Sequence, residues 1–189
     1  MAEAQDQRRA IESLNNGLVS FRLIHGIEAN IGADGELDLS APEAAQFELV
    51  LAALHSHLRK AYDQTPRLIT AVRNPAVRIL AHPRGRITGS RAGIVADWEA
   101  IFSIAAEEGV AIEIDGDPAR QDLDFTLAAR ALAHGCWFAL DSDAHTVDQL
   151  SYAETALAHA RLAGIPTERI VNCWPVERLL AWMINRQRS

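Results

Sequence analysis

The chain has few cysteines, no surplus of basic residues and no long apolar run. Cys136 and Cys173 stand far apart in apolar surroundings, without the paired spacing of a disulfide framework or a zinc site. The formal net charge of -7 argues against a large basic surface for wrapping duplex nucleic acid. Since we find neither a signal peptide nor an apolar stretch long enough to span a bilayer, we expect a cytoplasmic protein without membrane contact.

The composition is that of a globular protein. The 189 residues are 49% hydrophobic, which is enough for one domain with a sizeable core. Internal repeats and low-complexity linkers are absent from the sequence. We therefore treat residues 1–189 as a single domain.

Apolar runs and segments of helical length alternate along the chain. Strands are predicted where β-branched and large apolar residues gather, at 21–31, 49–54, 77–81, 110–114, 137–140 and 170–171. Helices are predicted at 2–16, 65–72, 97–108, 123–134, 147–163 and 176–184. A glycine closes three of these helices just before the next strand, namely Gly109, Gly135 and Gly164. This alternation is typical of an α/β fold with a parallel sheet or barrel.

Residues that bind metals recur where the predicted strands end. Glu28, His55 and His82 each lie late in, or directly after, a different strand. Because the carboxyl ends of parallel strands share one rim, these side chains are expected to converge there. Asp143 and His145 follow a further strand, and residues two apart in an extended segment share a face. Imidazole nitrogens with carboxylates suit zinc, manganese or iron, so the pattern predicts a divalent metal site.

The other histidines lack this setting. A single histidine near an apolar segment is more often a hydrogen-bonded structural residue than a metal ligand. We therefore predict no metal role for the remaining four, which are His25, His57, His134 and His159.

Several short segments, in this order, resemble the PHP (polymerase and histidinol phosphatase) superfamily. They are GIEANIGADGELDL, LAALHSHLR, ILAHPRGR, AIEIDGDPARQDL and ALDSDAHTVDQL, and the likeness runs from Arg8 to Trp182. The likeness is greatest to bacterial PHP hydrolases similar to the C-terminal domain of family-X DNA polymerases. It implies a distorted (β/α)7 barrel whose rim binds up to three divalent ions and hydrolyses phosphate esters.

The resemblance also implies roles for single residues. Glu28 matches the glutamate that bridges two metals, and His55 and His82 match further ligands of the second metal position. Asp143 matches the aspartate that closes the first position, and His145 matches a histidine of the third. Asp143 and His145 would also orient water or transfer a proton during catalysis.

Anion-binding groups are implied near the same rim. Arg84 and Arg86 follow His82 and would hold the phosphoryl oxygens. Arg59 and Lys60 follow His55 and are implied with them, but a solvated helix start is an equally good interpretation of that pair.

The chain also departs from the family pattern. Glu113 and Asp115 replace a Glu-x-Asn motif, so we expect them to support the metal ligands rather than bind the metal. The family opens with a strand bearing H-x-H, whereas no histidine occurs before His25 here. The resemblance therefore predicts an N-terminally truncated PHP barrel without its first two βα units and with fewer metals than three.

This departure has structural consequences. The prediction is an incomplete barrel of about five or six parallel strands with flanking helices. Its two unpaired edges, at the strand of Glu28 and at residues 170–171, would favour homo-oligomers formed by edge pairing.

The predicted function is a metal-dependent phosphoesterase acting on a small phosphorylated substrate. A non-catalytic PHP-like binding module is an alternative, because the H-x-H strand is missing. A DNA-processing 3'-5' exonuclease-like domain is the third interpretation, which the acidic balance disfavours.

Overall fold

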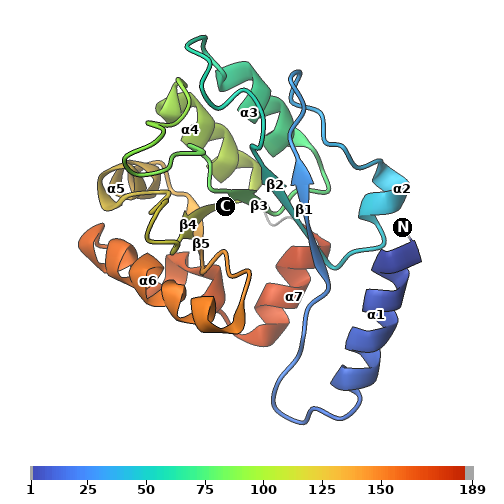
Figure 1. Ribbon diagram of the computed structural model, residues 1–189. Helices are drawn as coiled ribbons and strands as arrows, with labels where there is room; N and C mark the ends of the chain where they lie inside the picture. The colour runs from blue at the N-terminus through green and yellow to red at the C-terminus, as the bar shows by residue number, and fades with distance from the viewer. Residues whose placement is uncertain (1, 186–189) are drawn as a thin grey trace.

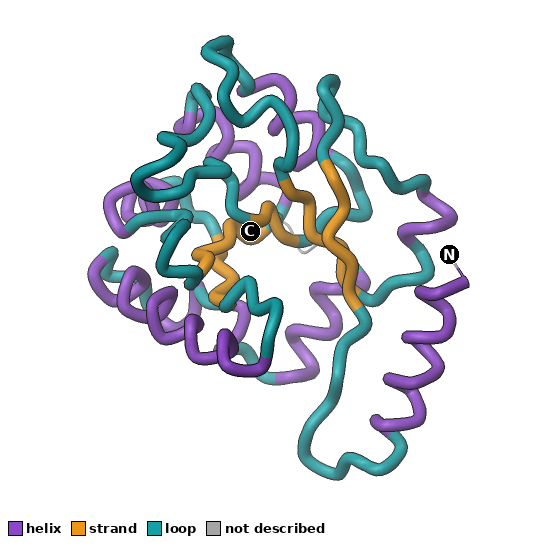
Figure 2. Tube along the Cα trace, viewed as in Figure 1, coloured by secondary structure: helices purple, strands orange, loops and turns teal. Residues whose placement is uncertain are grey.

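Five parallel strands form the centre of the structure, a computed structural model that describes residues 2–185. They pair in chain order, each with its neighbours in the sequence. Consecutive pairing of parallel strands is the arrangement of a (β/α) barrel, and Figure 2 shows the strands following an arc. The strands are β1 (Gly26–Asn30), β2 (Leu49–Ala53), β3 (Ile79–Ala81), β4 (Ala111–Asp115) and β5 (Trp137–Asp141).

Most of the helices lie around the outside of this arc (Figure 1). Asp97 begins the helix before β4 by accepting backbone hydrogen bonds at its side chain, and Gly109 ends it with a left-handed φ of 67°. The predicted alternation of strands and helices is therefore confirmed. The helices are α1 (Ala2–Asn15), α2 (Ala41–Ala44), α3 (Thr65–Arg73), α4 (Trp98–Glu108), α5 (Phe125–Ala133), α6 (Ala153–Leu162) and α7 (Val176–Ile184).

The outer face of the sheet packs against α3 to α6. Leu80, Ile112 and Phe138 occupy neighbouring positions on β3, β4 and β5 and are almost fully buried in this core. Phe102 from α4 and Leu127 from α5 belong to the same cluster. Burial of this apolar surface holds these helices against the sheet.

The inner face changes from apolar to polar along the strands. Leu51, Ile79, Ala111 and Trp137 pair in one row across four strands, and Glu28 stands at the end of this row on β1. Side chains two residues further along a strand share the same face, and these positions become polar near the carboxyl ends. The polar positions are Glu113, Asp115 and Asp141.

Helix α7 covers the apolar part of the inner face. Trp182 packs edge-to-face against Trp137 and Trp174, with ring centroids 6.4 and 5.8 Å apart, and its indole N–H donates to the carbonyl of Gly109 at 2.9 Å. The buried side chain of Arg78 donates to the last two carbonyls of α7, those of Met183 and Ile184. Side chains of α7 thus fill the space inside the arc near the amino ends of the strands. The space near the carboxyl ends is left for polar residues.

Three predicted elements differ in the structure. The segment 170–171 is not a sixth strand, because Ile170 makes only one bridge to Phe138. The side chain of Asn172 instead pairs with the N–H and C=O of Leu140 at 2.8 Å each, and so occupies the free edge of β5. The predicted helix 147–163 divides into a 3-10 segment, 147–152, and α6.

Two further differences lie near β1 and β2. The predicted strand 21–31 is shorter, because the His25 N–H and Arg22 both bind the Glu48 carboxylate instead of continuing a ladder. No helix starts at Arg59 and Lys60, which lie in a loop. Within residues 2–185, no helix combines the length and apolar character needed to cross a bilayer.

Candidate metal centre

Three of the predicted ligands meet at the carboxyl ends of the strands. His55 Nε2 lies 3.1 Å from Glu28 Oε1, and His82 Nε2 lies 3.6 Å from Glu28 Oε2. One ligand atom from each residue lies within 4.8 Å of the other two. Among the described His, Cys, Asp and Glu residues, only these three form such a group. Two imidazoles and one glutamate are the donor set of several catalytic zinc sites.

Asp38 and Asn30 fix the ring of His55. The Asp38 carboxylate accepts the backbone N–H of Asn30 at 2.8 Å and also a hydrogen bond from the Asn30 amide nitrogen. A carboxylate accepts hydrogen bonds, so the Asn30 amide turns its nitrogen to Asp38 and its Oδ1 to His55 Nδ1, 2.5 Å away. Because an amide oxygen accepts as well, the proton of neutral His55 sits on Nδ1.

The remaining lone pair of His55 therefore faces a carboxylate. Burial lowers the pKa of His55 by more than the negative charge of Glu28 raises it, so the ring is neutral at pH 7. Its Nε2 and Glu28 Oε1 are then two acceptors 3.1 Å apart. Two acceptors at this distance repel unless a cation or a proton lies between them. The residues thus fit a divalent ion held jointly by the imidazole and the carboxylate.

His82 is held tightly on the other side of Glu28. Its side chain is 1% exposed, and its backbone N–H donates to the Glu113 carboxylate. Burial alone would lower the pKa of His82, but the hydrogen bond with Glu28 and the charge of Glu28 outweigh it, so the pKa is raised. Burial acts to raise the pKa of Glu28, yet the contacts with His82 and His55 lower it overall. His82 Nδ1 is buried and has no hydrogen-bond partner among the described residues.

Four carboxylates crowd the rim beyond His82, at positions Glu113, Asp115, Asp141 and Asp143. Burial raises the pKa of Glu113 well above its ordinary value, and Asp141 raises it further. Burial, together with the charges of Asp143 and Asp141, raises the pKa of Asp115 to about 7. Burial likewise raises the pKa of Asp141. Such a group of buried acids requires protons or nearby positive charge to be stable.

Arg120 supplies positive charge to these acids. Its Nε lies 3.1 Å from Asp143 Oδ2, 3.7 Å from Asp115 Oδ2 and 3.8 Å from Asp117 Oδ2. Its loop lies against β5 and the 3-10 segment 147–152 at Gly116, where an added Cβ would stand 2.7 Å from the carbonyl oxygen of Asp141 and 2.1 Å from that of Tyr152. Only glycine therefore allows the loop to approach this closely.

The charge of Arg120 also reaches the three-residue group. It disfavours protonation of Glu28, His55 and His82, although burial and the contacts within that group have larger effects on each pKa. The guanidinium thus acts on the acids and on the candidate metal ligands together.

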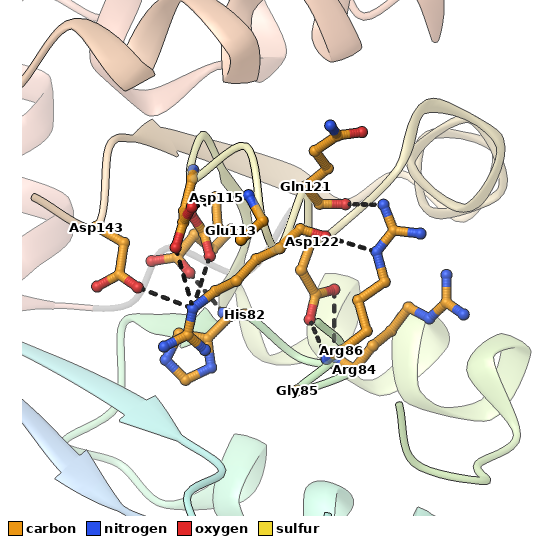
Figure 3. Close-up of polar contacts among 12 residues, drawn as sticks. His82, Arg84, Gly85, Arg86, Glu113, Asp115, Gln121, Asp122 and Asp143 are labelled. Atoms are coloured by element: carbon orange, nitrogen blue, oxygen red, sulfur yellow. Dashed lines mark hydrogen bonds and ion pairs between the residues drawn. The ribbon is translucent and has the colours of Figure 1, made fainter. Parts of the chain in front are cut away.

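Asp143 and His145 lie outside the three-residue group. Asp143 pairs with Arg120, and Figure 3 shows it to one side of His82. His145 is exposed, its Nδ1 lies 2.8 Å from the carbonyl oxygen of Asp143, and its backbone N–H donates to Gln149. Their metal-binding and catalytic roles stay predictions.

Arg84 and Arg86 use their side chains within the protein. Arg84 forms an ion pair of 2.7 Å with Asp124, and Arg86 donates to the carbonyls of Arg120 at 2.7 Å and Gln121 at 2.6 Å. Figure 3 shows both side chains extending away from His82. In this arrangement they hold the loop that carries Arg120, and their predicted role as phosphate ligands stays untested.

Arg59 and Lys60 line an open cavity beside His55. The cavity measures ≈ 330 Å³ and also includes Arg91. Arg59 donates to the carbonyl of Ser90 at 3.0 Å, and Lys60 is exposed. Three basic side chains next to a candidate metal site make this cavity suited to an anion.

Left-handed backbone conformations concentrate at this rim. Four non-glycine residues in the described chain have positive φ, with values from 26° to 60°. Such conformations cost energy and cluster at functional sites. The residues are His57, His82, Gln121 and Asp143.

Comparison with known proteins places the chain in a family. No family model matches it. A protein named probable phosphatase YcdX, from Escherichia coli O81 (strain ED1a), is 30% identical over 174 residues, which cover 87% of this chain and 68% of that protein. The DNA polymerase/3'-5' exonuclease PolX of Bacillus subtilis (strain 168) is 31% identical over 180 residues. The chain belongs to the PHP family.

This PHP chain matches its relatives to different extents. The match covers 95% of the chain but 32% of the length of the Bacillus subtilis polymerase. Probable phosphatase YcdX from Shigella flexneri serotype 5b is again 30% identical, over 68% of its length. These relatives support the predicted PHP resemblance, although not a particular subtype within the family.

Some functional candidates of this PHP protein were missed from the sequence. Asn30 and Asp38 lie within the quoted segment GIEANIGADGELDL, yet their contact depends on a turn after β1. Arg120 lies in AIEIDGDPARQDL, where three nearby aspartates were the available signal that a cation belongs there. Only the packing of the loop after β4 on β5 reveals the contact of Arg120 with Asp143.

Proposed function

We propose that this PHP protein is a metal-dependent phosphoesterase that hydrolyses phosphate ester bonds in a small phosphorylated substrate. The observation that carries the proposal is the contact of the neutral His55 imidazole with the Glu28 carboxylate, next to His82. Two acceptors in this position repel unless a proton or a cation lies between them, and a metal ion held by both relieves the repulsion. The name of YcdX, probable phosphatase, supports the reaction class.

The proposed site holds a divalent ion of zinc, manganese or iron at Glu28, His55 and His82. Such an ion supplies positive charge to a phosphoryl oxygen and acidifies an attacking water. Asn30 keeps the proton of His55 on Nδ1, which leaves Nε2 for binding. Glu113 holds the backbone of His82 in place.

Other side chains would act on the substrate. Asp143 and His145 are proposed to orient water or carry a proton, since both follow the carboxyl end of β5, the same end of the sheet as the proposed metal ligands. Arg59 and Lys60 line the basic cavity and are proposed to attract the phosphate. Arg84 and Arg86 are proposed to contribute charge from behind the loop of Arg120.

The test combines metal content with hydrolysis. Protein freed of metal with a chelator is dialysed against Mn²⁺ or Zn²⁺, and bound metal and hydrolysis of p-nitrophenyl phosphate are measured. We expect stoichiometric metal and metal-dependent hydrolysis in the original chain, and loss of both in His82→Ala. His134→Ala is the matched control, because His134 contacts Glu99 on the outer helices. Absence of stoichiometric metal, or unchanged metal content and rate in His82→Ala, would reject the proposal.

The relationship to PolX favours a second candidate, a 3'-5' exonuclease-like activity. Release of mononucleotides from 3'-labelled single-stranded DNA, compared with p-nitrophenyl phosphate hydrolysis, separates the two. Stoichiometric metal without turnover on either substrate would instead indicate a non-catalytic binding module.

A further inference from the structure

Arg120 is a charged residue whose hydrogen-bonding capacity the protein leaves unused. All three of its ion pairs have Nε as the atom closest to the carboxylate, at 3.1 to 3.8 Å. No described residue accepts a hydrogen bond from its side chain, which is 20% exposed. The terminal nitrogens of the guanidinium are therefore available to a ligand.

The carboxylates beside Arg120 show the same lack of directed bonding. Asp115 Oδ2 and Asp143 Oδ2 are buried and have no hydrogen-bond partner among the described residues, although both face Arg120. Arg120 is thus positioned by charge rather than by a forked hydrogen bond. Such a guanidinium keeps its planar donors for a second anion.

The neighbouring arginines differ in this respect. Arg84 donates to Asp124 and to the carbonyl of Ala92, while Arg86 donates to the carbonyls of Arg120 and Gln121. These bonds also anchor the backbone of Arg120 itself. The arrangement fixes the backbone of Arg120 and leaves the terminal nitrogens of its guanidinium without a hydrogen bond.

The charge balance of the rim requires such a group. A phosphate ester at the candidate metal site would be repelled by nearby carboxylates such as Glu28 and Asp143. Arg120 lies close enough to the candidate ligands to influence Glu28, His55 and His82 electrostatically. It therefore pairs with the acids Asp115 and Asp143 and lies within electrostatic reach of the candidate metal ligands.

We propose that Arg120 binds the phosphoryl oxygens of the substrate, a phosphate ester, through its terminal guanidinium nitrogens. This inference rests on the proposed phosphoesterase function and adds the residue that holds the anionic end of the substrate. Arg120 in this role touches the reacting group, and Asp115 and Asp143 position it from behind.

The experiment measures binding of inorganic phosphate to the manganese-loaded protein by calorimetry, together with bound manganese. In Arg120→Ala we expect phosphate affinity to fall about 10- to 100-fold, as for loss of a hydrogen bond between charged groups, while manganese content is unchanged. The phosphate affinity of Arg120→Lys should lie between the two, because lysine keeps the positive charge but lacks the paired planar donors of a guanidinium. Arg130→Ala is the matched control, since Arg130 pairs with Glu99 on the protein's outer surface.

The outcomes separate this inference from the proposed function. Phosphate affinity within about twofold of the original in Arg120→Ala, with manganese retained, would overturn the role of Arg120 alone. Absence of phosphate binding in the loaded original chain, or loss of manganese and of the folded state in both Arg120 variants, would overturn it as well. Failure of the original chain to bind manganese would reject the phosphoesterase proposal itself.

Discussion

Substitution of Asn30 by alanine should weaken metal binding without disturbing the fold. Asn30 accepts the Nδ1–H of His55 at 2.5 Å, and Asp38 determines which end of its amide faces the ring. In Asn30→Ala this acceptor is absent, so neutral His55 is free to carry its proton on Nε2, the atom that faces Glu28. The ring would then have to change tautomer before it binds a metal.

The magnitude follows from the exposure of the two residues. The side chain of Asn30 is exposed at the end of β1 and makes two hydrogen bonds, so its truncation should lower the free energy of unfolding by no more than about 2 kcal/mol, at about 1 kcal/mol for each bond. The His55 side chain is 44% exposed and has few other contacts to hold it. Loss of a residue that orients a metal-binding histidine typically lowers metal affinity by about 10- to 100-fold.

The assay is competition for Zn²⁺ or Mn²⁺ with a calibrated chelator, followed by urea denaturation of the same samples. Asn74→Ala is the control, because the Asn74 side chain accepts only the backbone N–H of Ala76 at the opposite end of β3. Asp38→Asn should give a smaller loss than Asn30→Ala, since the amide of Asn30 keeps its acceptor but loses its fixed orientation. Metal affinity in Asn30→Ala within about twofold of the original would refute this account of how His55 is oriented.

Three further predictions follow from the fold and the acids. The pKa of Asp115 is about 7 in the folded protein and near 3.8 in the unfolded chain, so between these values the folded state binds a proton that the unfolded state does not. The metal-free protein should therefore lose on the order of 2 to 4 kcal/mol of stability from pH 4 to pH 7. In urea titrations, Asp115→Asn should make stability depend less on pH. A slope equal in both proteins would contradict it. Trp182→Ala should lower the free energy of unfolding by about 3 to 5 kcal/mol, as its side chain is almost fully buried under the sheet, and a loss under about 1 kcal/mol would argue against that packing. Since Asn172 occupies the edge of β5, self-association should use the edge of β1; light scattering should show oligomers, and a monomer at high concentration would count against this.

The sequence predicted the order of strands and helices well, because the signals were local. The strand at 49–54 and the helix end at Gly109 can both be predicted from the residues in the segment itself, without knowledge of distant contacts. The segment 170–171 has the same apolar character, but the Asn172 side chain takes the edge of β5 instead. Competition between a side chain and a backbone ladder cannot be read from a two-residue run.

The position of a site residue was predictable only where it lies at the carboxyl end of a parallel strand. Glu28, His55 and His82 converge because each is placed at the carboxyl end of a neighbouring parallel strand. The contacts of Arg84, Arg86 and Arg120 depend on how two loops pack against each other, and residue type alone gives no direction for such side chains.

The most direct test of the metal centre is anomalous diffraction from crystals soaked in Mn²⁺ or Zn²⁺. We expect a peak between the carboxylate of Glu28 and the Nε2 atoms of His55 and His82, at coordination distances of about 2.0 to 2.2 Å. A map with no peak there from fully soaked crystals, or with the metal bound only elsewhere on the protein, would contradict the account.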